Sequence, residues 1–381
     1  MSGSPQERAR FGYIDNLRST MIVWVVAFHT AITYSHIGAW YYSDPAPVDQ
    51  ASSVIFLTLE VHSQAFFMGL LFLLAGYFVP GAFDRKGFGR FMTDRFVRLG
   101  VPSLIYIFAV QPLMLHYLLH YGSGGSLADY YRGFLASRDW LTGAGPMWFA
   151  IALLIFSLIY GLFRTFVPGK KRPSASAAPG LAALMAAGLL IAVFAFLIRI
   201  VEPMGANVLY FQPAFFAQYI ALFAAGIVAY RNDWLARLPT QFGYRLLAGA
   251  AILGPAAWFA LLVLGGGLEK GIAPFIGGWH WQSAGYALWE SLFCMAFSVG
   301  LIVLYRERLN GSGRLSKLLS ANSFGIYFLH PPVVVAVSQA FIWLALPPLV
   351  KWLVVVPLAF LAALAIVHLV VRRMPLLRRI V

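Results

Sequence analysis

The chain contains 381 residues, of which 60% are hydrophobic and 11% are charged, and its mean hydropathy is +0.76. This composition excludes a soluble globular domain, because about a quarter of the residues in such a domain are charged. The formal net charge of +14 does not indicate a nucleic-acid partner, since the sequence offers no soluble basic domain that could bind one.

Ten apolar segments follow one another along the chain, and each is close to the ~20 residues that a helix needs to cross a bilayer. They span residues 17–37, 54–78, 101–121, 147–167, 181–201, 215–230, 246–264, 286–305, 323–343 and 352–371. The first segment is full length and no small-residue cleavage site follows it, which favours an anchor over a signal peptide. We therefore predict an all-α polytopic membrane protein with about ten transmembrane helices, forming a single domain over residues 1–381.

Basic residues are distributed unequally between the two sets of connecting loops, and such a bias marks the cytoplasmic side. If the N-terminus is cytoplasmic, most of the 28 lysines and arginines lie on that side, and the opposite side has Arg132, Arg138, Arg199, Lys270 and Lys351. Both termini are then predicted to be cytoplasmic. The cytoplasmic parts include an N-terminal segment (1–16), a Pro/Ser/Ala-rich linker loop (168–180) and a basic tail (372–381).

The first apolar segment carries two basic side chains, Arg18 at its start and His29 near its middle. Ionisable groups inside a membrane segment are costly unless they face partners or water, so they indicate function. At ~1.5 Å per residue the two lie about 16 Å apart along the helix axis, and the steps 18, 22, 25 and 29 return to one face. Asp15, three residues before Arg18, is placed to pair with it. This pattern predicts a site along one side of the first helix.

Four more ionisable side chains are predicted between mid-depth and the outer surface. Glu60 and His62 lie in the outer third of the second segment, Glu290 in the outer third of the eighth, and His330 near the middle of the ninth. Two prolines follow His330 directly and predict a kink there. The single cysteine, Cys294, gives no basis for a disulfide framework or a thiolate metal site, so no metal site is predicted.

Arg95 and Arg98 lie where the third segment enters from the predicted cytoplasmic side. As an i, i+3 pair they share one helix face, and guanidinium groups bind phosphate oxygens in a bidentate manner. They are therefore candidates for binding a phosphorylated ligand. The alternative is ordinary anchoring by positive charge at the cytoplasmic surface.

Several short motifs occur in order over nearly the whole chain. They are residues 10–18 (RFGYIDNLR) followed by Phe28-His29, then 72–78 (FLLAGYF), 95–102 (RFVRLGVP), 145–149 (GPMWF), 219–226 (YIALFAAG), 289–291 (WES) and 323–331 (SFGIYFLHP). This ordered set resembles the integral-membrane acyltransferase 3 family. The region from His62 to Tyr77 and the linker-poor form resemble its glucan biosynthesis protein C subgroup, whose namesake succinylates periplasmic glucans. Unlike some relatives, this sequence shows no C-terminal extracytoplasmic hydrolase-like domain.

The resemblance implies a reaction in which an acyl group, acetyl or succinyl, moves from cytoplasmic acyl-coenzyme A to a hydroxyl of an extracytoplasmic glycan or related acceptor. Acyl-coenzyme A is then a co-substrate, and no tightly bound cofactor is expected. His29 would be the general base, a role typically worth ~10²–10⁴-fold in rate, and Arg95 and Arg98 would bind the donor phosphates. The expected location is the cytoplasmic (inner) membrane of a bacterium.

Several of the other candidate residues have more than one interpretation. Glu290 would orient His29 or bind acceptor hydroxyls, or would form a structural ion pair. His330 and Tyr327 would line the cavity, and Glu60 and His62 would lie at its outer edge. Trp148 would stack on a sugar, or would belong to the interfacial aromatic belt. Arg18 would contact the donor, or would brace the site together with Asp15.

A transporter or a flippase for a glycan or lipid-linked precursor is the alternative function, because it also needs His, Arg and Glu within helices. Such proteins often contain paired, broken half-helices, and the sequence shows no such pair. A sensor or scaffold with a buried polar core is a third possibility. The ordered motif set favours the acyltransferase over both.

Overall fold

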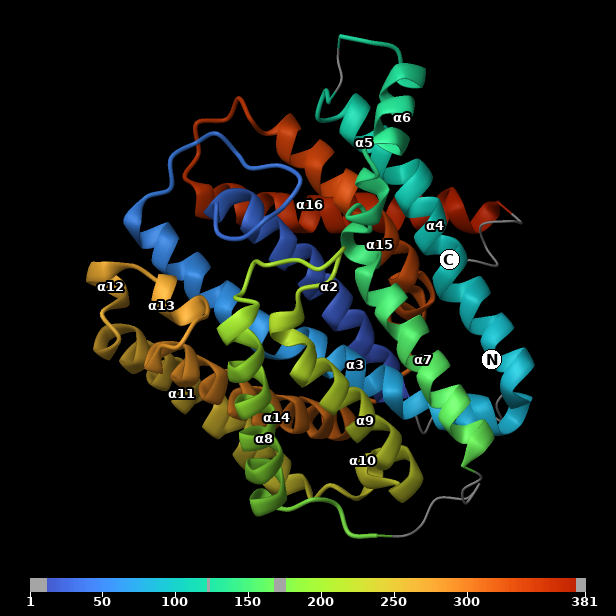
Figure 1. Cartoon of the computed structure of the whole chain (residues 1–381), viewed down its shortest axis with the longest axis vertical. Coiled ribbons are helices and arrows are strands. Elements are labelled where there is room, and N and C mark those ends of the chain that lie inside the picture. Colours follow the sequence, from blue (N-terminus) through green and yellow to red (C-terminus); the bar gives the residue numbers. More distant parts are fainter. Residues whose placement is uncertain (1–11, 122–123, 168–175, 375–381) are drawn as a thin grey trace.

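The computed structural model describes residues 12–121, 124–167 and 176–374, and this part of the chain is helical, with no β-strand (Figure 1). Its all-α class is the predicted one. Much of the predicted N-terminal segment, linker loop and basic tail (1–11, 168–175 and 375–381) lies outside the described residues.

The main helices are α2 (Gly12–Ser35), α3 (Gln50–Arg95), α4 (Val101–Ile105), α5 (Gln111–Tyr117), α6 (Leu127–Ala136), α7 (Trp148–Phe166), α8 (Leu181–Val201), α9 (Phe216–Asn232), α11 (Thr240–Leu264), α14 (Trp281–Arg308), α15 (Arg314–Ala340) and α16 (Pro348–Leu369). Shorter helical elements are η1 (Phe96–Gly100), η2 (Tyr106–Val110), η3 (Asp139–Leu141), η4 (Gly145–Met147), η5 (Pro213–Phe215), α10 (Trp234–Arg237), α12 (Gly267–Lys270), α13 (Ala273–Ile276) and η6 (Val371–Arg373). Each predicted apolar segment overlaps one or more of these helices.

Eight helical segments of the described chain are long and apolar enough to cross a membrane. They are Gln50–Tyr117, Gly145–Phe166, Leu181–Val201, Pro213–Asn232, Thr240–Leu264, Trp281–Arg308, Arg314–Ala340 and Pro348–Arg373. These segments fit a multi-pass membrane protein. α2, which contains Asp15, Arg18 and His29, is not among them. The number of ten crossings and the cytoplasmic termini stay predictions.

The long segment Gln50–Tyr117 contains two of the predicted apolar segments, and the chain turns between them (Figure 1). Gly87 has φ 70° and ψ 171° at this turn, a conformation that glycine adopts without steric cost. Two π-helical turns, η1 and η2, follow the turn. π-Helical turns are rare in proteins, and those that do occur often lie at functional sites. η1 contains Arg98.

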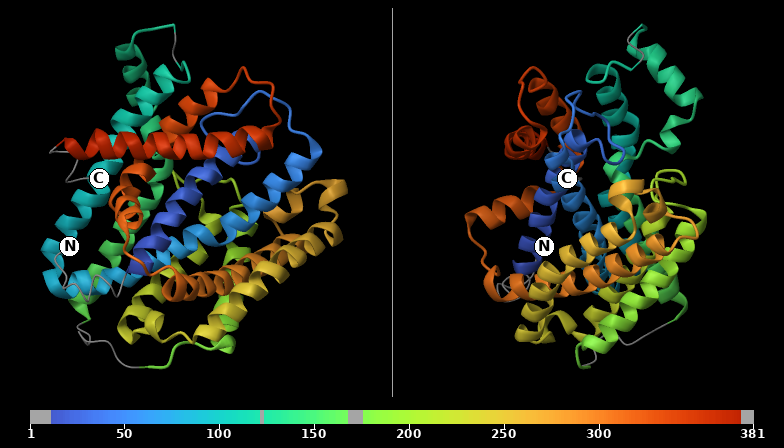
Figure 2. Two further views of the ribbon diagram at one scale, coloured as in Figure 1. Left: turned by 180° about the vertical axis from the view of Figure 1, so that it is seen from behind. Right: turned by 90° about the vertical axis from the view of Figure 1, so that its left-hand side faces the viewer.

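α3 lies in the middle of the bundle. It packs against α2 on one side and against α9 and α14 on the other, while α15 and α16 pack on α2, and α8 and α11 pack on α14 (Figure 2). The approach of α3 and α9 requires glycine, because a Cβ at Gly76 would lie 2.2 Å from the Phe223 carbonyl oxygen and one at Gly226 would lie 2.1 Å from that of Leu73. Small residues allow such close backbone contact between membrane helices.

The peripheral helices expose apolar side chains. Ile252 and Leu253 of α11 are 70% and 67% exposed, and Leu190 of α8 is 59% exposed. A soluble monomer rarely exposes continuous apolar surface of this kind, whereas lipid covers it without cost. The polar side chains discussed below instead lie mainly between the central helices.

Candidate active site

The central polar contact of the site joins α2 to α15. His29 Nδ1 lies 2.9 Å from His330 Nε2, and the two imidazole rings are nearly parallel, with centroids 5.0 Å apart. His330 is fully buried, and His29 is half-buried. The structure therefore brings the predicted base and a predicted cavity residue into direct contact, although they are 301 positions apart.

The prolines after His330 explain how its ring is held. α15 continues through Pro331 and Pro332 as one helix. Pro331 has no N–H, so the Tyr327 carbonyl, four residues earlier, has no helical hydrogen-bond donor. His330 Nδ1 occupies that position, 2.6 Å from the Tyr327 oxygen. The proline thus creates the acceptor that orients the histidine.

These contacts assign the protons of both neutral rings. A carbonyl oxygen only accepts, so His330 Nδ1 carries the hydrogen and its Nε2 has a free electron pair. His29 Nδ1 must then donate its hydrogen to His330 Nε2, which leaves His29 Nε2 unprotonated. No hydrogen bond to this Nε2 occurs within the part of the chain that the structure describes. Because the Nδ1–H of His29 is held by a hydrogen bond, its Nε2 is the nitrogen that can accept a proton.

Aromatic side chains enclose the histidine pair. The Trp40 ring stacks on His29 with centroids 4.0 Å apart and planes 9° apart. The Tyr327 ring lies 5.9 Å from the His330 ring, and its hydroxyl donates to the carbonyl of Pro146 in η4, directly before α7. Tyr327 therefore lies beside His330, and its hydroxyl already has a partner.

The connection between α2 and α3, residues 36–49, holds Trp40 in place. Asp44 and Lys351 of α16 form a buried ion pair with an O–N distance of 3.0 Å, and the Asp44 amide donates to the Thr33 carbonyl at 2.9 Å. The hydroxyl of Tyr41 donates to Gln111 Oε1 at 2.9 Å. At the end of the same connection, Asp49 caps α3 by accepting from the Ser52 amide. Hydrogen bonds from Ser52 hold the pKa of the exposed Asp49 carboxyl below its usual value.

The predicted pairing of Asp15 with Arg18 is present, with an O–N distance of 3.7 Å, and both side chains are 37% exposed. They lie on the same helix as His29, nearer its first residue, Gly12. Neither contacts the histidine pair among the described hydrogen bonds and ion pairs. The structure thus places them on the same helix as His29 but separate from the histidine pair.

Arg95 and Arg98 lie at the junction of α3 and η1. The Arg95 guanidinium is 5.2 Å from the centroid of the Phe91 ring, and Arg98 is exposed. Asp94, next to Arg95, pairs with Lys86. Arg95 and Arg98 therefore present positive charge beside the Gly87 turn.

Glu290 lies in a second buried polar centre. Its Oε2 accepts from Arg199 Nη2 at 2.5 Å, and both side chains are almost inaccessible. Arg199 Nε also donates to the Ala214 carbonyl at 3.1 Å. The contact partner of Glu290 is therefore Arg199, whereas His330 orients His29. This geometry corresponds to the structural ion pair, one of the two interpretations of Glu290.

The remaining predicted residues contact neither histidine of the pair in the described structure. Glu60 is buried and accepts from the Ser35 hydroxyl at 2.6 Å. His62 Nδ1 donates to the Thr58 carbonyl at 2.7 Å, and its ring packs edge-on against Trp289. Trp148 stacks on Tyr219 inside the bundle, with centroids 5.6 Å apart. Glu60 thus contacts α2, His62 contacts α14 and Trp148 contacts α9.

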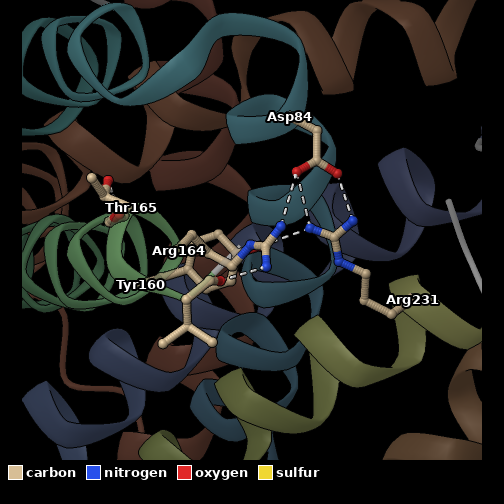
Figure 3. Close-up of polar contacts among 7 residues, drawn as sticks. Asp84, Tyr160, Arg164, Thr165 and Arg231 are labelled. Atoms are coloured by element: carbon tan, nitrogen blue, oxygen red, sulfur yellow. Dashed lines mark hydrogen bonds and ion pairs between the residues drawn. The ribbon is translucent and has the colours of Figure 1, made fainter. Parts of the chain in front are cut away.

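A polar cluster near the Gly87 turn joins three helices (Figure 3). Arg231 of α9 forms two hydrogen bonds to the Asp84 carboxylate of α3, at 2.5 and 3.1 Å, and a third to the Tyr160 hydroxyl of α7 at 3.0 Å. Arg164 lies 4.0 Å from the same carboxylate. The distribution of basic residues predicts these arginines only as cytoplasmic cations, and it predicts no role for Asp84. The available signal was an acidic residue directly before Arg85 and Lys86 in a mainly basic segment.

Trp40, Lys351 and Arg199 were not predicted as site or core residues. The two cations were assigned to the outer loops, because each lies at the end of an apolar segment. Buried ion pairs such as Asp44–Lys351 and Arg199–Glu290 join a cation at a helix end to an acid elsewhere in the chain. Many combinations of residues in the sequence satisfy that condition, so the sequence does not identify the true pairs.

The chain matches a model of a known protein family. This model, described as an acyltransferase domain, matches residues 11–370. No curated protein and no solved structure matches the chain.

Proposed function

The chain belongs to the acyltransferase 3 family and is therefore an acyltransferase, and on this premise we propose its donor, its acceptor and its general base. The acyl group, acetyl or succinyl, comes from cytoplasmic acyl-coenzyme A. The acceptor is a hydroxyl of an extracytoplasmic glycan or a related molecule. The general base is His29. The membrane is the cytoplasmic membrane of a bacterium.

The observation that carries this proposal is the chain of hydrogen bonds from the Tyr327 carbonyl through His330 to His29. It leaves His29 Nε2 unprotonated and fixes the direction of its electron pair. A general base must present such a nitrogen to the proton that it removes.

The reaction follows from this arrangement. His29 Nε2 accepts the proton of the acceptor hydroxyl while the hydroxyl oxygen attacks the thioester carbonyl. The new C–O bond forms, the C–S bond breaks, and the proton passes from His29 to the sulfur of coenzyme A. While His29 is charged, its Nδ1–H bond to His330 becomes charge-assisted and therefore stronger. His330 thus stabilises the transition state more than the resting state, which is the requirement for catalysis.

Arg95 and Arg98 supply the donor site in this proposal. Their guanidinium groups bind the phosphates of coenzyme A, and the pantetheine arm spans the distance to the thioester at His29. The separation of the arginine pair from the histidine pair suits a donor whose charged and reactive ends are far apart. Arg18, paired with Asp15, braces the same face of α2.

The test uses purified protein in lipid nanodiscs with labelled acetyl- and succinyl-coenzyme A. We expect saturable binding of one donor, and loss of that binding in Arg95→Ala and Arg98→Ala. Arg308→Ala, which removes an exposed arginine at the end of α14, is the control for nonspecific loss of positive charge and should bind normally.

The acceptor is identified by mass spectrometry of surface glycans from cells with and without the protein. A mass difference of one acyl unit per modified sugar is expected, and its size distinguishes acetyl from succinyl. Absence of saturable donor binding, together with glycans that are unchanged in acylation but reduced in amount outside the membrane, would contradict the proposal and favour a flippase.

A further inference from the structure

The mechanism above leaves one aromatic contact of His29 without a role. Trp40 lies parallel to the His29 ring at a centroid distance of 4.0 Å, and it is also parallel to the His330 ring, at 6.0 Å. Its indole Nε1 is buried and has no hydrogen-bond partner in the described structure. The position of this ring is therefore not explained by a hydrogen bond of its own.

The connection that carries Trp40 is held by contacts to two other helices, α5 and α16. Tyr41, the next residue, is tied to Gln111 of α5, and Asp44 is tied to Lys351 of α16. The charges of Asp44 and Lys351 neutralise each other. The titratable group that contacts His29 directly is His330, from α15. The Trp40 face is thus held against His29 without adding a net charge beside it.

The consequence of this stacking depends on the charge of His29. The face of an indole ring carries negative electrostatic potential, and it attracts a cation within about 6 Å of the ring centre. In the resting state His29 is neutral, and the attraction is that of an ordinary aromatic pair. When His29 has taken the acceptor proton, the same geometry becomes a cation–π contact. The gain therefore arises along the reaction and not in the resting state.

We propose that Trp40 is a positioning residue that stabilises the imidazolium form of His29 through the face of its indole ring. The inference rests on the proposed role of His29 as the base. It assigns a catalytic contribution to the connection between α2 and α3, outside the motifs identified in the sequence.

The test replaces Trp40 by tryptophan analogues with one to four fluorine atoms on the indole, introduced at this position alone. Fluorine lowers the negative potential of the ring face and changes its size little. We expect kcat for acyl transfer to fall stepwise with each fluorine, by roughly three- to thirty-fold over the series. The KM for the acyl donor should stay unchanged.

Two controls separate this effect from a structural one. The same analogues at Trp343, which is 91% exposed, should leave kcat unchanged. Trp40→Phe should retain more activity than Trp40→Leu, at equal thermal stability after correction for the folded fraction. A kcat that is constant across the fluorinated series would overturn the inference, even if Trp40→Leu is inactive.

His29→Gln is measured in parallel so that the two proposals fail separately. If His29→Gln retains full transfer, the proposed base is wrong, and the inference about Trp40 falls with it. If His29→Gln is inactive and the fluorinated series is flat, the inference about Trp40 alone is wrong.

Discussion

Two buried polar centres of this protein use different chemistry. The pair of His29 and His330, between α2 and α15, is a relay of neutral rings that leaves one nitrogen unprotonated. The pair of Arg199 and Glu290, between α8 and α14, joins opposite charges at 2.5 Å. The first centre can still accept a proton, whereas in the second each charge is neutralised by its partner.

The comparison indicates how function and stability are divided among ionisable residues in the bundle. Removing two charges from water costs several kcal/mol per ion, and only close pairing offsets that cost. Arg199–Glu290, Asp44–Lys351 and Asp84–Arg231 all show such pairing. The histidines carry no such cost while they are neutral, so they can remain chemically available.

The largest effect expected from this comparison is on stability. Arg199→Met leaves the Glu290 carboxylate buried without its cation, and it should lower the free energy of unfolding by about 3–5 kcal/mol. The double variant Arg199→Met/Glu290→Leu should recover most of that loss, because no charge is then buried. Thermal unfolding in detergent measures both, and transfer per folded molecule should be close to normal in the double variant. A double variant no more stable than Arg199→Met would show that the pair does not act as proposed.

A smaller effect is expected when the relay is broken at His330. His330→Leu removes the acceptor for His29 Nδ1–H, so the His29 ring loses its fixed tautomer, and kcat should fall on the order of 10²-fold. His330→Gln offers an amide oxygen in place of Nε2 and should retain more activity than His330→Leu. Steady-state kinetics at saturating donor distinguish the two. Equal activity in both variants would contradict the relay.

The ion pair between Asp44 and Lys351 should affect acyl transfer as well as stability, whereas the pair between Arg199 and Glu290 should affect stability alone. Lys351→Met leaves Asp44 buried without a cation and loosens the connection that carries Trp40, so kcat should fall by roughly tenfold. Asp44→Asn/Lys351→Met removes both charges and should recover part of kcat. The measurement is kcat per folded molecule, compared with the Arg199→Met/Glu290→Leu variant. A normal kcat in Lys351→Met would mean that the connection does not position the site.

The smallest effect is expected at the exposed Asp49 carboxyl group, and it concerns the pH dependence of stability. Asp49 caps α3, and hydrogen bonds from Ser52 hold its pKa below the usual value. A carboxyl with a depressed folded pKa stabilises the protein above its unfolded pKa, and the stabilisation is lost as the pH falls. Asp49→Asn keeps a side chain that can cap α3. It should remove the Asp49 contribution to the loss of stability below about pH 4. Unfolding midpoints measured between pH 3 and 7, roughly the range set by a carboxyl group, test it. Identical slopes for the two proteins would contradict the assignment.

Helices with uniform composition could be predicted closely from the sequence. α8 occupies Leu181–Val201, the range predicted from its uninterrupted apolar residues. α15 begins at Arg314, nine residues before the predicted start, because its first turns are polar and lie outside the apolar window. Propensity and hydropathy report local preference, so they place helix centres better than helix ends.

The site could be predicted only in part. His29, His330 and Tyr327 were each singled out, but the contact between His29 and His330 depends on the packing of α2 against α15. No spacing rule connects residues that far apart in the chain. Pro331 carried a local signal, since it frees the carbonyl that orients His330. Trp40 gave no signal, because an aromatic residue in a loop resembles an ordinary interfacial residue.

The most direct test of the central claim compares donor binding with acyl transfer in His29→Gln. The purified variant should bind labelled acyl-coenzyme A with the wild-type Kd and unfold at the wild-type temperature. It should transfer the acyl group ~10²–10⁴-fold more slowly, whereas His368→Gln, at an exposed position of α16, should be normal. Transfer at the wild-type rate by His29→Gln would show that another group removes the acceptor proton.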